Sequence, residues 1–200
     1  DGEDREYVCT IDELENEQVR AKIEDVNGVA KELPIKVTLF QALPKGDKME
    51  TVIQKMIELG AYEIVPVFTK RCIVKLDNKK AVSKTKRWNS IAESAAKQSK
   101  RGIIPKVSMP VTYKVAEAMD MVLIPYENAE NMAHTRQVVS QIKTDMTVGI
   151  FIGPEGGFAE EEVEQAINTG AYDITLGKRI LRTETAGMAL MSVLMFETEE

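Results

Sequence analysis

The chain has 200 residues and a hydrophobic fraction of 44%, enough for one large domain or for one domain plus a fragment of another. No apolar run approaches the ~18 residues of a membrane span and no signal peptide is recognisable, so we expect a cytoplasmic protein with no membrane partner. The single histidine and two distant cysteines fit no usual metal-ligand spacing. We therefore expect reduced thiols at Cys9 and Cys72, and no metal.

Short alternating stretches at 7–11 and 19–23 predict β-strands in an acidic N-terminal region, which Leu33-Pro34 separates from the rest of the chain. After this boundary, strand-like and helix-like patterns alternate. Strands are predicted at 35–43, 64–68, 121–125, 148–152 and 174–176, with a further candidate at 72–76; helices are predicted at 48–59, 85–98, 132–142, 160–168 and 183–196. This alternation predicts an α/β fold with a mostly parallel sheet and helices on both faces.

Two of these helices carry additional information. The helix at 48–59 has an apolar face and stops at Gly60. The helix at 183–196 is apolar on more than one side, so one side fills the core and the other needs a second cover. A partner subunit is the simplest cover, and ordinary core packing of its methionines is the alternative.

The basic residues are concentrated in one part of an otherwise acidic chain of net charge −6. Between 70 and 106 the only acids are Asp77 and Glu93. The basic residues of this stretch are Lys70, Arg71, Lys75, Lys79, Lys80, Lys84, Lys86, Arg87, Lys97, Lys100, Arg101 and Lys106. Such a block predicts a local phosphate-binding face, although a merely solvated helix and loop would have the same composition.

Two loops with glycine come after apolar strand patterns near the C-terminus. Gly153-Pro154-Glu155-Gly156-Gly157 comes after 148–152, and Leu176-Gly177 comes after 172–175. Because glycine lets a ligand approach the main chain, two such loops at neighbouring strand ends predict a backbone-lined pocket. There is no P-loop, and Glu160–Glu162 would repel a phosphate at the start of the next helix. The pocket therefore suits a neutral or cationic nucleoside-like ligand.

Several motifs occur in an order that resembles one family. They are Pro44–Glu50, Glu58–Ala61, Ile64–Pro66, Arg71, Arg87-Trp88, Ala95–Ser99, Ile104-Pro105, Gly153–Phe158 and Leu176–Ala186. Together they resemble the RsmE family of ribosomal RNA methyltransferases in the SPOUT superfamily, over about Leu33 to the C-terminus. The resemblance implies methyl transfer from S-adenosyl methionine to N3 of a uridine in small-subunit (16S) ribosomal RNA. It also implies a homodimer that acts on this RNA or on the 30S particle.

The resemblance further implies a C-terminal trefoil knot and an N-terminal PUA-like β-barrel. Residues 1–32 would then be the remnant of that barrel, and 33–200 the methyltransferase domain. Three features depart from the family pattern: most of the barrel is absent, the stretch between Pro105 and Met121 is short, and Ala159 stands where a Ser or Thr is usual. The last change removes a helix cap and costs about 1 kcal/mol.

We predict the site residues on this basis. The cofactor-binding residues would be Ile124, Gly153, Pro154, Glu155, Gly156, Gly157, Leu176, Gly177, Ile180, Leu181 and Thr185. Arg182 would stabilise the charge that spreads to the uridine oxygens when the N3 proton leaves. Glu184 would act as a base or orient Arg182; a structural ion pair of the two is the alternative. The RNA-binding residues would be Lys45, Arg71, Lys86, Arg87, Gln98 and Arg101.

Two other functions fit parts of the pattern. An RNA-binding module of the same fold without catalysis would keep the basic block, but the intact glycine loops argue against it. A nucleotide-dependent enzyme on a doubly wound sheet would need a phosphate cradle, which neither loop supplies. The proton acceptor is not identified by any residue in the sequence.

Overall fold

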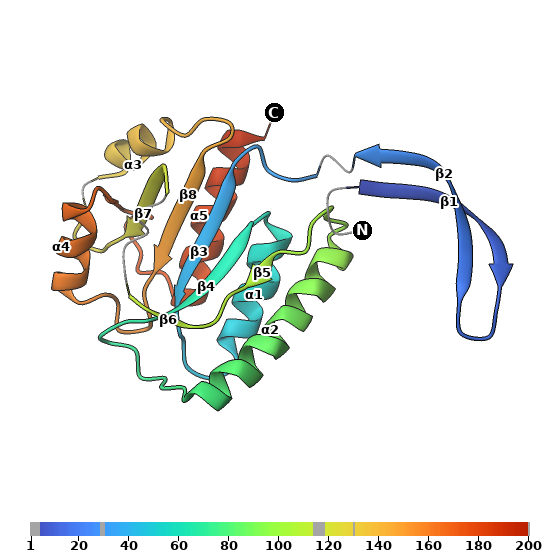
Figure 1. Ribbon diagram of the computed structural model, residues 1–200. Helices are drawn as coiled ribbons and strands as arrows, with labels where there is room; N and C mark the ends of the chain where they lie inside the picture. Colours follow the sequence, from blue (N-terminus) through green and yellow to red (C-terminus); the bar gives the residue numbers. More distant parts are fainter. Residues whose placement is uncertain (1–4, 29–30, 114–118, 130, 200) are drawn as a thin grey trace.

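The structure consists of an α/β body and a two-stranded hairpin that projects from it (Figure 1). The computed structural model describes residues 5–28, 31–113, 119–129 and 131–199. The hairpin strands are β1 (Arg5–Leu14) and β2 (Val19–Gly28). The strands of the body are β3 (Lys36–Ala42), β4 (Glu63–Phe68), β5 (Lys106–Val107), β6 (Val111–Thr112), β7 (Met121–Pro125), β8 (Thr147–Ile152) and β9 (Tyr172–Ile174). The helices are α1 (Lys48–Glu58), α2 (Asn78–Gln98), α3 (Met132–Val139), α4 (Glu160–Asn168) and α5 (Thr183–Thr198).

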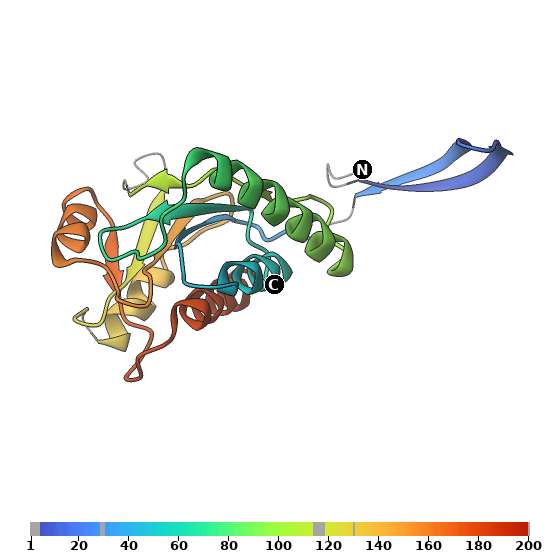
Figure 2. The ribbon, with the colours of Figure 1, turned by 90° about the horizontal axis from the view of Figure 1, so that it is seen from below.

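The sheet of the body has the order β5-β4-β3-β8-β7-β9, with β6 also paired to β4. Each of these pairings is parallel, which confirms the predicted sheet. Because parallel strands need long crossover connections, the helices lie on the faces of the sheet and bury it. Figure 2 shows α1 and α5 side by side on one face.

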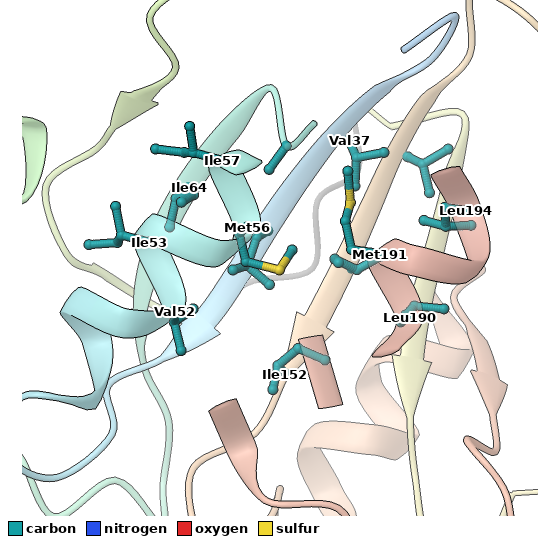
Figure 3. Packing of buried hydrophobic residues seen from close by; sticks show 14 of the residues in the cluster. Val37, Val52, Ile53, Met56, Ile57, Ile64, Ile152, Leu190, Met191 and Leu194 are labelled. Carbon is teal, nitrogen blue, oxygen red and sulfur yellow. The ribbon is translucent and has the colours of Figure 1, made fainter. Parts of the chain in front are cut away.

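The two faces of the sheet are covered unequally. The larger core joins side chains of β3, β8 and β7 to α1, α2, α3 and α5; Figure 3 shows Met56 of α1 and Met191 of α5 in it. On the other face a smaller core joins Ile124 and Phe151 to α4, and Phe40 stacks on Phe151 with ring centroids 4.3 Å apart. Alternate residues of one strand serve the two cores, as the pleat requires.

The structure differs from the sequence prediction at several element boundaries. Residues 72–76 form no strand: their exposure alternates, but no neighbouring strand supplies hydrogen bonds. The last strand is 172–174 instead of 174–176, and β5 and β6, two residues each, were not predicted. Helix α2 begins seven residues before 85, because Asp77 caps it by accepting a hydrogen bond from the Lys80 amide at 2.8 Å.

The missing cap residue at position 159 is compensated locally. Ala159 has no side-chain acceptor, but the Glu162 carboxylate accepts a hydrogen bond from the Ala159 amide at 2.8 Å. This is the glutamate half of a capping box, and it fixes the start of α4 where the sequence predicted it.

The hairpin is amphipathic although both of its faces are exposed. Cross-strand pairs Tyr7–Val26, Cys9–Ile23, Ile11–Ala21 and Leu14–Val19 alternate with pairs that each contain a charged residue, so one face is apolar. Two register shifts keep the apolar side chains on the same face, between Val8 and Cys9 and between Ile11 and Glu13. The predicted strands are confirmed, and each is longer than expected.

The turn after α1 generates a stability prediction. Gly60 has φ of +99°, and a Cβ added there would lie 2.8 Å from Leu33 side-chain carbons. Gly170 has a similar φ of +95° but open space around it, so Gly170→Ala is the matched control. We expect Gly170→Ala to cost about 1–2 kcal/mol for the left-handed backbone alone, and Gly60→Ala to cost more. Urea denaturation measures both, and equal losses would contradict the role of Leu33.

Candidate functional site

A cavity of about 980 Å³ opens at the carboxyl ends of β7, β8 and β9. Its walls include the end of each strand and the residues that follow it: 125–127 at the end of β7, 152–158 at the end of β8 and 175–183 after β9. In parallel sheets these ends meet at one edge, which is where α/β folds bind ligands. The volume lies within the range of small-molecule sites.

Most of the predicted cofactor residues line this cavity. They are Gly153, Pro154, Glu155, Gly156, Gly157, Leu176, Gly177, Ile180 and Leu181. The Ile124 side chain is fully buried in the smaller core, while its neighbour Pro125 lines the cavity, so the contribution predicted for Ile124 would come from the backbone at this strand end. One prediction needs correction. Thr185 is exposed on the first turn of α5 and does not line the cavity.

The loop after β8 is closed on itself. The Gly157 amide donates to the Pro154 carbonyl at 2.8 Å. A Cβ at Gly153 would lie 3.2 Å from backbone atoms of Gly157 and Phe158, so a larger residue there would force the loop open. At Gly156 the nearest atom would be Cβ of Arg71, at an ordinary 3.5 Å. The tight turn therefore depends on glycine at position 153 more than at position 156.

Lys70 binds the acidic start of α4, so that helix end already has its partners. The Lys70 amide donates to the buried Glu162 carboxylate at 2.8 Å, and its ammonium group is paired with Glu161. The Glu162 carboxylate also binds the Ala159 amide. Because these acids occupy the positive end of the helix, the start of α4, which follows Phe158 of the cavity wall, does not suit a phosphate.

Lys48, at the start of α1, links two acids at the rim of the cavity. Its ammonium group lies 2.9 Å from the Glu155 carboxylate and 3.5 Å from that of Glu184. The Lys45 amide donates to the same Glu155 oxygen at 3.1 Å. Burial alone would raise the pKa of Glu155, but the hydrogen bonds from Lys48 and from backbone amides outweigh it and lower that pKa. The sequence motif contained Lys48, but nothing in its spacing marked it as part of the site.

Arg71, for which the sequence predicts RNA binding, lies beside the predicted cofactor loop. It lines the cavity, and its guanidinium group donates to the Gly156 carbonyl at 2.9 Å. This charge-assisted hydrogen bond stabilises the conformation of the predicted cofactor loop.

The two predicted catalytic residues are not joined to each other. Arg182 is exposed and lines the cavity, and its backbone carbonyl accepts hydrogen bonds from the Thr185 and Ala186 amides at the start of α5. Within the described part of the chain its guanidinium group makes no hydrogen bond or ion pair. Glu184 pairs with Lys48 and does not line the cavity.

Sequence reasoning missed several residues of the cavity wall. They are Lys48, Tyr126, Glu127, Asn131, Met132, Ala133, Ile152, Phe158, Thr175, Thr183 and Ala186. Three come from the start of α3, which Asn131 caps by accepting from the amides of Ala133 and His134. The Thr135 hydroxyl donates to the Thr175 carbonyl at 3.0 Å and thereby ties α3 to the end of β9. The sequence signal for this wall is Asn131, a helix-capping residue type directly before a helical pattern.

The remaining predicted RNA-binding residues lie in three different places. Lys45 is exposed beside the Glu155 loop, while Lys86, Arg87 and Gln98 are exposed on α2. The prediction that Arg101 binds RNA is wrong. Its side chain is only 4% exposed, is paired with Glu32, and donates to the carbonyls of Ile57 and Ala61. It joins the end of α1 to the segment before β3, and its buried guanidinium group is not accessible to RNA.

Other features of the sequence have simple outcomes. Cys9 is exposed and Cys72 half-buried, both as free thiols, and burial raises the pKa of Cys72. The described residues contain no group of three His, Cys, Asp or Glu side chains arranged to hold a metal ion. Within the same residues no helix has the length and apolar character to span a bilayer.

The fold and this cavity define an RNA methyltransferase domain, whose family model matches residues 31–195. The ribosomal RNA small subunit methyltransferase E of Bacillus subtilis is 36% identical over 97% of this chain and 78% of its own length. The crystal structure of a ribosomal RNA small subunit methyltransferase E from Neisseria gonorrhoeae bound to S-adenosyl methionine is 32% identical, with a TM-score of 0.80 over 96% of this chain and 78% of that one. A putative methyltransferase from Legionella pneumophila, also with bound S-adenosyl methionine, is 34% identical with a TM-score of 0.80 over 96% and 79%. The chain belongs to the ribosomal RNA small subunit methyltransferase E family.

The Lys48–Glu155 pair predicts a pH-dependent contribution to stability. A lowered carboxylate pKa stabilises the folded state above the unfolded-state value of about 4.3, and this is lost as the pH falls through the lower folded value. We expect Lys48→Met to reduce the free energy of unfolding at neutral pH, with a difference from the wild type that shrinks below about pH 4. Urea denaturation from pH 3 to 7 measures it.

Lys55→Met is the matched control, since Lys55 lies on the same helix and pairs with Glu58 only one turn away. A Lys48→Met effect that stays constant over this pH range, or that equals the control, would show that Lys48 does not lower the pKa of Glu155.

Proposed function

We propose that this chain transfers the methyl group of S-adenosyl methionine to N3 of a uridine in small-subunit (16S) ribosomal RNA. The observation that carries the proposal is the glycine-loop cavity at the ends of β7, β8 and β9. It occurs in a chain whose relatives are ribosomal RNA small subunit methyltransferases, and two similar methyltransferases are solved with S-adenosyl methionine. The uridine and its N3 atom rest on the motif resemblance.

The cavity fits this cofactor by its chemistry. The main chain of Gly153–Gly157 and of Leu176-Gly177 offers amides and carbonyls to polar groups, while Ile180 and Leu181 supply aliphatic wall. S-adenosyl methionine carries a sulfonium cation and no phosphate, in agreement with the acidic start of α4 and with Glu155 at the rim. When bound, it supplies an electrophilic methyl group.

We propose that Arg182 stabilises the negative charge that develops during the reaction. Methylation of uridine N3 requires loss of its proton, and negative charge then spreads to the two flanking oxygens. A guanidinium group at the cavity wall with no other partner among the described residues can donate to such an oxygen. Glu184 is paired with Lys48. We therefore propose that Glu184 holds Lys48 against the loop and does not act as the base. No side chain of the described wall stands out as the proton acceptor.

We propose that α2 contributes to the RNA-binding surface. Its exposed face carries Lys79, Lys80, Lys86 and Arg87, and Lys75 precedes it. Arg87 pairs with Glu50 and Lys80 with Asp77, whereas Lys86 has no ion pair among the described residues. Counterion release from phosphates would make this binding depend on salt.

The domain organisation, the knot and the location of the chain are also proposals. The separate β1–β2 sheet supports residues 1–32 as part of a PUA-like domain, with 33–200 as the methyltransferase domain. The position of β9 outside β7, with α5 then returning to α1, supports the trefoil knot. A ribosomal substrate implies the cytoplasm.

Mapping of modified nucleosides tests the function. Unmodified small-subunit RNA, free and within 30S particles, is incubated with the protein and S-adenosyl methionine and then digested for mass spectrometry. We expect one uridine to gain a methyl group at N3. RNA binding without any methyl transfer would support the non-catalytic alternative, and methylation of another base would overturn the proposed specificity.

Arg182→Ala should separate catalysis from RNA binding. Loss of a donor that acts in the transition state costs about 3 kcal/mol, or on the order of a hundredfold in single-turnover rate, with little change in cofactor affinity. Lys86→Ala, on α2, should leave the single-turnover rate at saturating RNA unchanged. It should reduce by about one the steepness with which the logarithm of RNA affinity falls with the logarithm of salt concentration. If Arg182→Ala weakened RNA binding and kept its saturated rate, the role proposed for Arg182 would be wrong.

We also propose a homodimer in which α5 lies at the interface. Phe196 is 81% exposed and Val193 is exposed, although both lie on an apolar helix. We expect Phe196→Glu to yield monomers at micromolar concentration in light scattering. Ile73→Glu places the same charge at an exposed apolar position outside α5 and should remain dimeric. A monomeric wild type would rule out the dimer.

A further inference from the structure

A hydrogen-bonded relay of Gln41, Thr183 and Gly153 runs from the centre of the sheet to the cavity. It begins at Gln41, near the carboxyl end of β3, between β4 and β8, with 0% of the residue exposed. The Gln41 side-chain amide donates to the Thr183 hydroxyl at 2.9 Å. The Thr183 hydroxyl in turn donates to the Gly153 carbonyl at 2.6 Å. Residues 142 and 30 positions apart are thereby connected.

The direction of these hydrogen bonds is fixed by the chemistry of the groups. A hydroxyl has one proton, and Thr183 uses it on the carbonyl of Gly153, so toward Gln41 it can only accept. The Gln41 amide nitrogen must therefore face Thr183. The same nitrogen donates to the Ala42 carbonyl at 2.9 Å. If the Gln41 amide were reversed, its oxygen would face the Thr183 hydroxyl oxygen, and no proton would be left for a hydrogen bond between them.

Gln41 is a costly residue for this position. Its side-chain oxygen is buried and has no hydrogen-bond partner among the described residues. An unpaired buried acceptor costs about 1–3 kcal/mol, whereas an apolar side chain of similar shape would avoid that cost. Packing alone thus favours methionine or leucine here, and what the amide adds is its hydrogen bonds to the Ala42 carbonyl and the Thr183 hydroxyl.

Thr183 and Gly153, the last two members of the relay, lie in two different walls of the cavity. Gly153 is the first residue of the loop after β8, and Thr183 is the first residue of α5, directly after Arg182. Both line the cavity. The hydrogen bond between them sets the separation of the two walls, and Gln41 sets the orientation of the hydroxyl that makes it.

We propose that Gln41 is a positioning residue for the ligand cavity, acting through Thr183 to hold the Gly153 carbonyl and the start of α5 in register. It touches no ligand, so its effect is on the geometry of the loop walls. The identity of the ligand, S-adenosyl methionine or its product, rests on the proposed function. The hydrogen-bonded relay does not depend on it.

The first test is Gln41→Met, with Thr38→Val as the matched control because Thr38 is also buried on β3, outside the cavity wall. We expect the melting temperature of Gln41→Met to be equal to or above that of the wild type. We expect faster amide hydrogen exchange at 153–158 and 183–186, and about fivefold weaker binding of S-adenosyl homocysteine in calorimetry. Thr38→Val should change neither exchange in those segments nor affinity.

A double-mutant cycle separates the relay from a general packing effect. Thr183→Val should weaken binding, Thr183→Ser should restore it, and Gln41→Met should add nothing in the Thr183→Val background. Additive losses, or a Gln41→Met variant with lowered melting temperature and unchanged loop exchange, would overturn the proposal. If the wild type failed to bind S-adenosyl homocysteine, the proposed function would fail, while the exchange data would still test the relay.

Discussion

The parallel pairing of β7, β8 and β9 is the constraint on which the site depends. Since all three strands run in the same direction, the segments that leave them emerge at one edge and enclose a common space. The loop after β8 can stay close to the sheet because Gly153 allows its backbone to fold back on itself. The segment after β9 then leads into α5, which crosses back to pack on α1 and β8.

The acidic side chains around this space are paired with lysines, and these ion pairs stabilise the conformation of the loops. Glu155 and Glu184 share Lys48, and Glu161 and Glu162 share Lys70. The two lysines come from opposite ends of the chain between β3 and α2, so the first half of the domain fixes loops that belong to the second half. Arg71 adds a third contact of this kind at Gly156. A cationic ligand without phosphate is compatible with such a rim.

Two apolar surfaces are left without a cover in the described chain. One is the apolar face of the β1–β2 hairpin, where Ile11, Leu14 and Val19 are exposed. The other is the outer side of α5 with Phe196. The hairpin projects from the body (Figure 1), whereas α5 packs on the body and exposes only its outer side.

The sequence by itself determined the order of the long elements, the parallel sheet and the two glycine loops, because periodicity and glycine placement are local properties of the chain. It also identified much of the cavity wall, since residues that come after parallel strands must meet at one edge. The short strands β5 and β6 were missed because two residues have no periodicity to read.

Only the tertiary structure decided which side chains share a neighbourhood across long separations. Arg101 belongs to a basic block in the sequence, yet it is buried against Glu32 and two carbonyls. Ile124 turns from the cavity because the pleat of β7 assigns it to the other core. Lys48 and Gln41 had no local signal at all, since their partners Glu155 and Thr183 come close only after the sheet and α5 have packed.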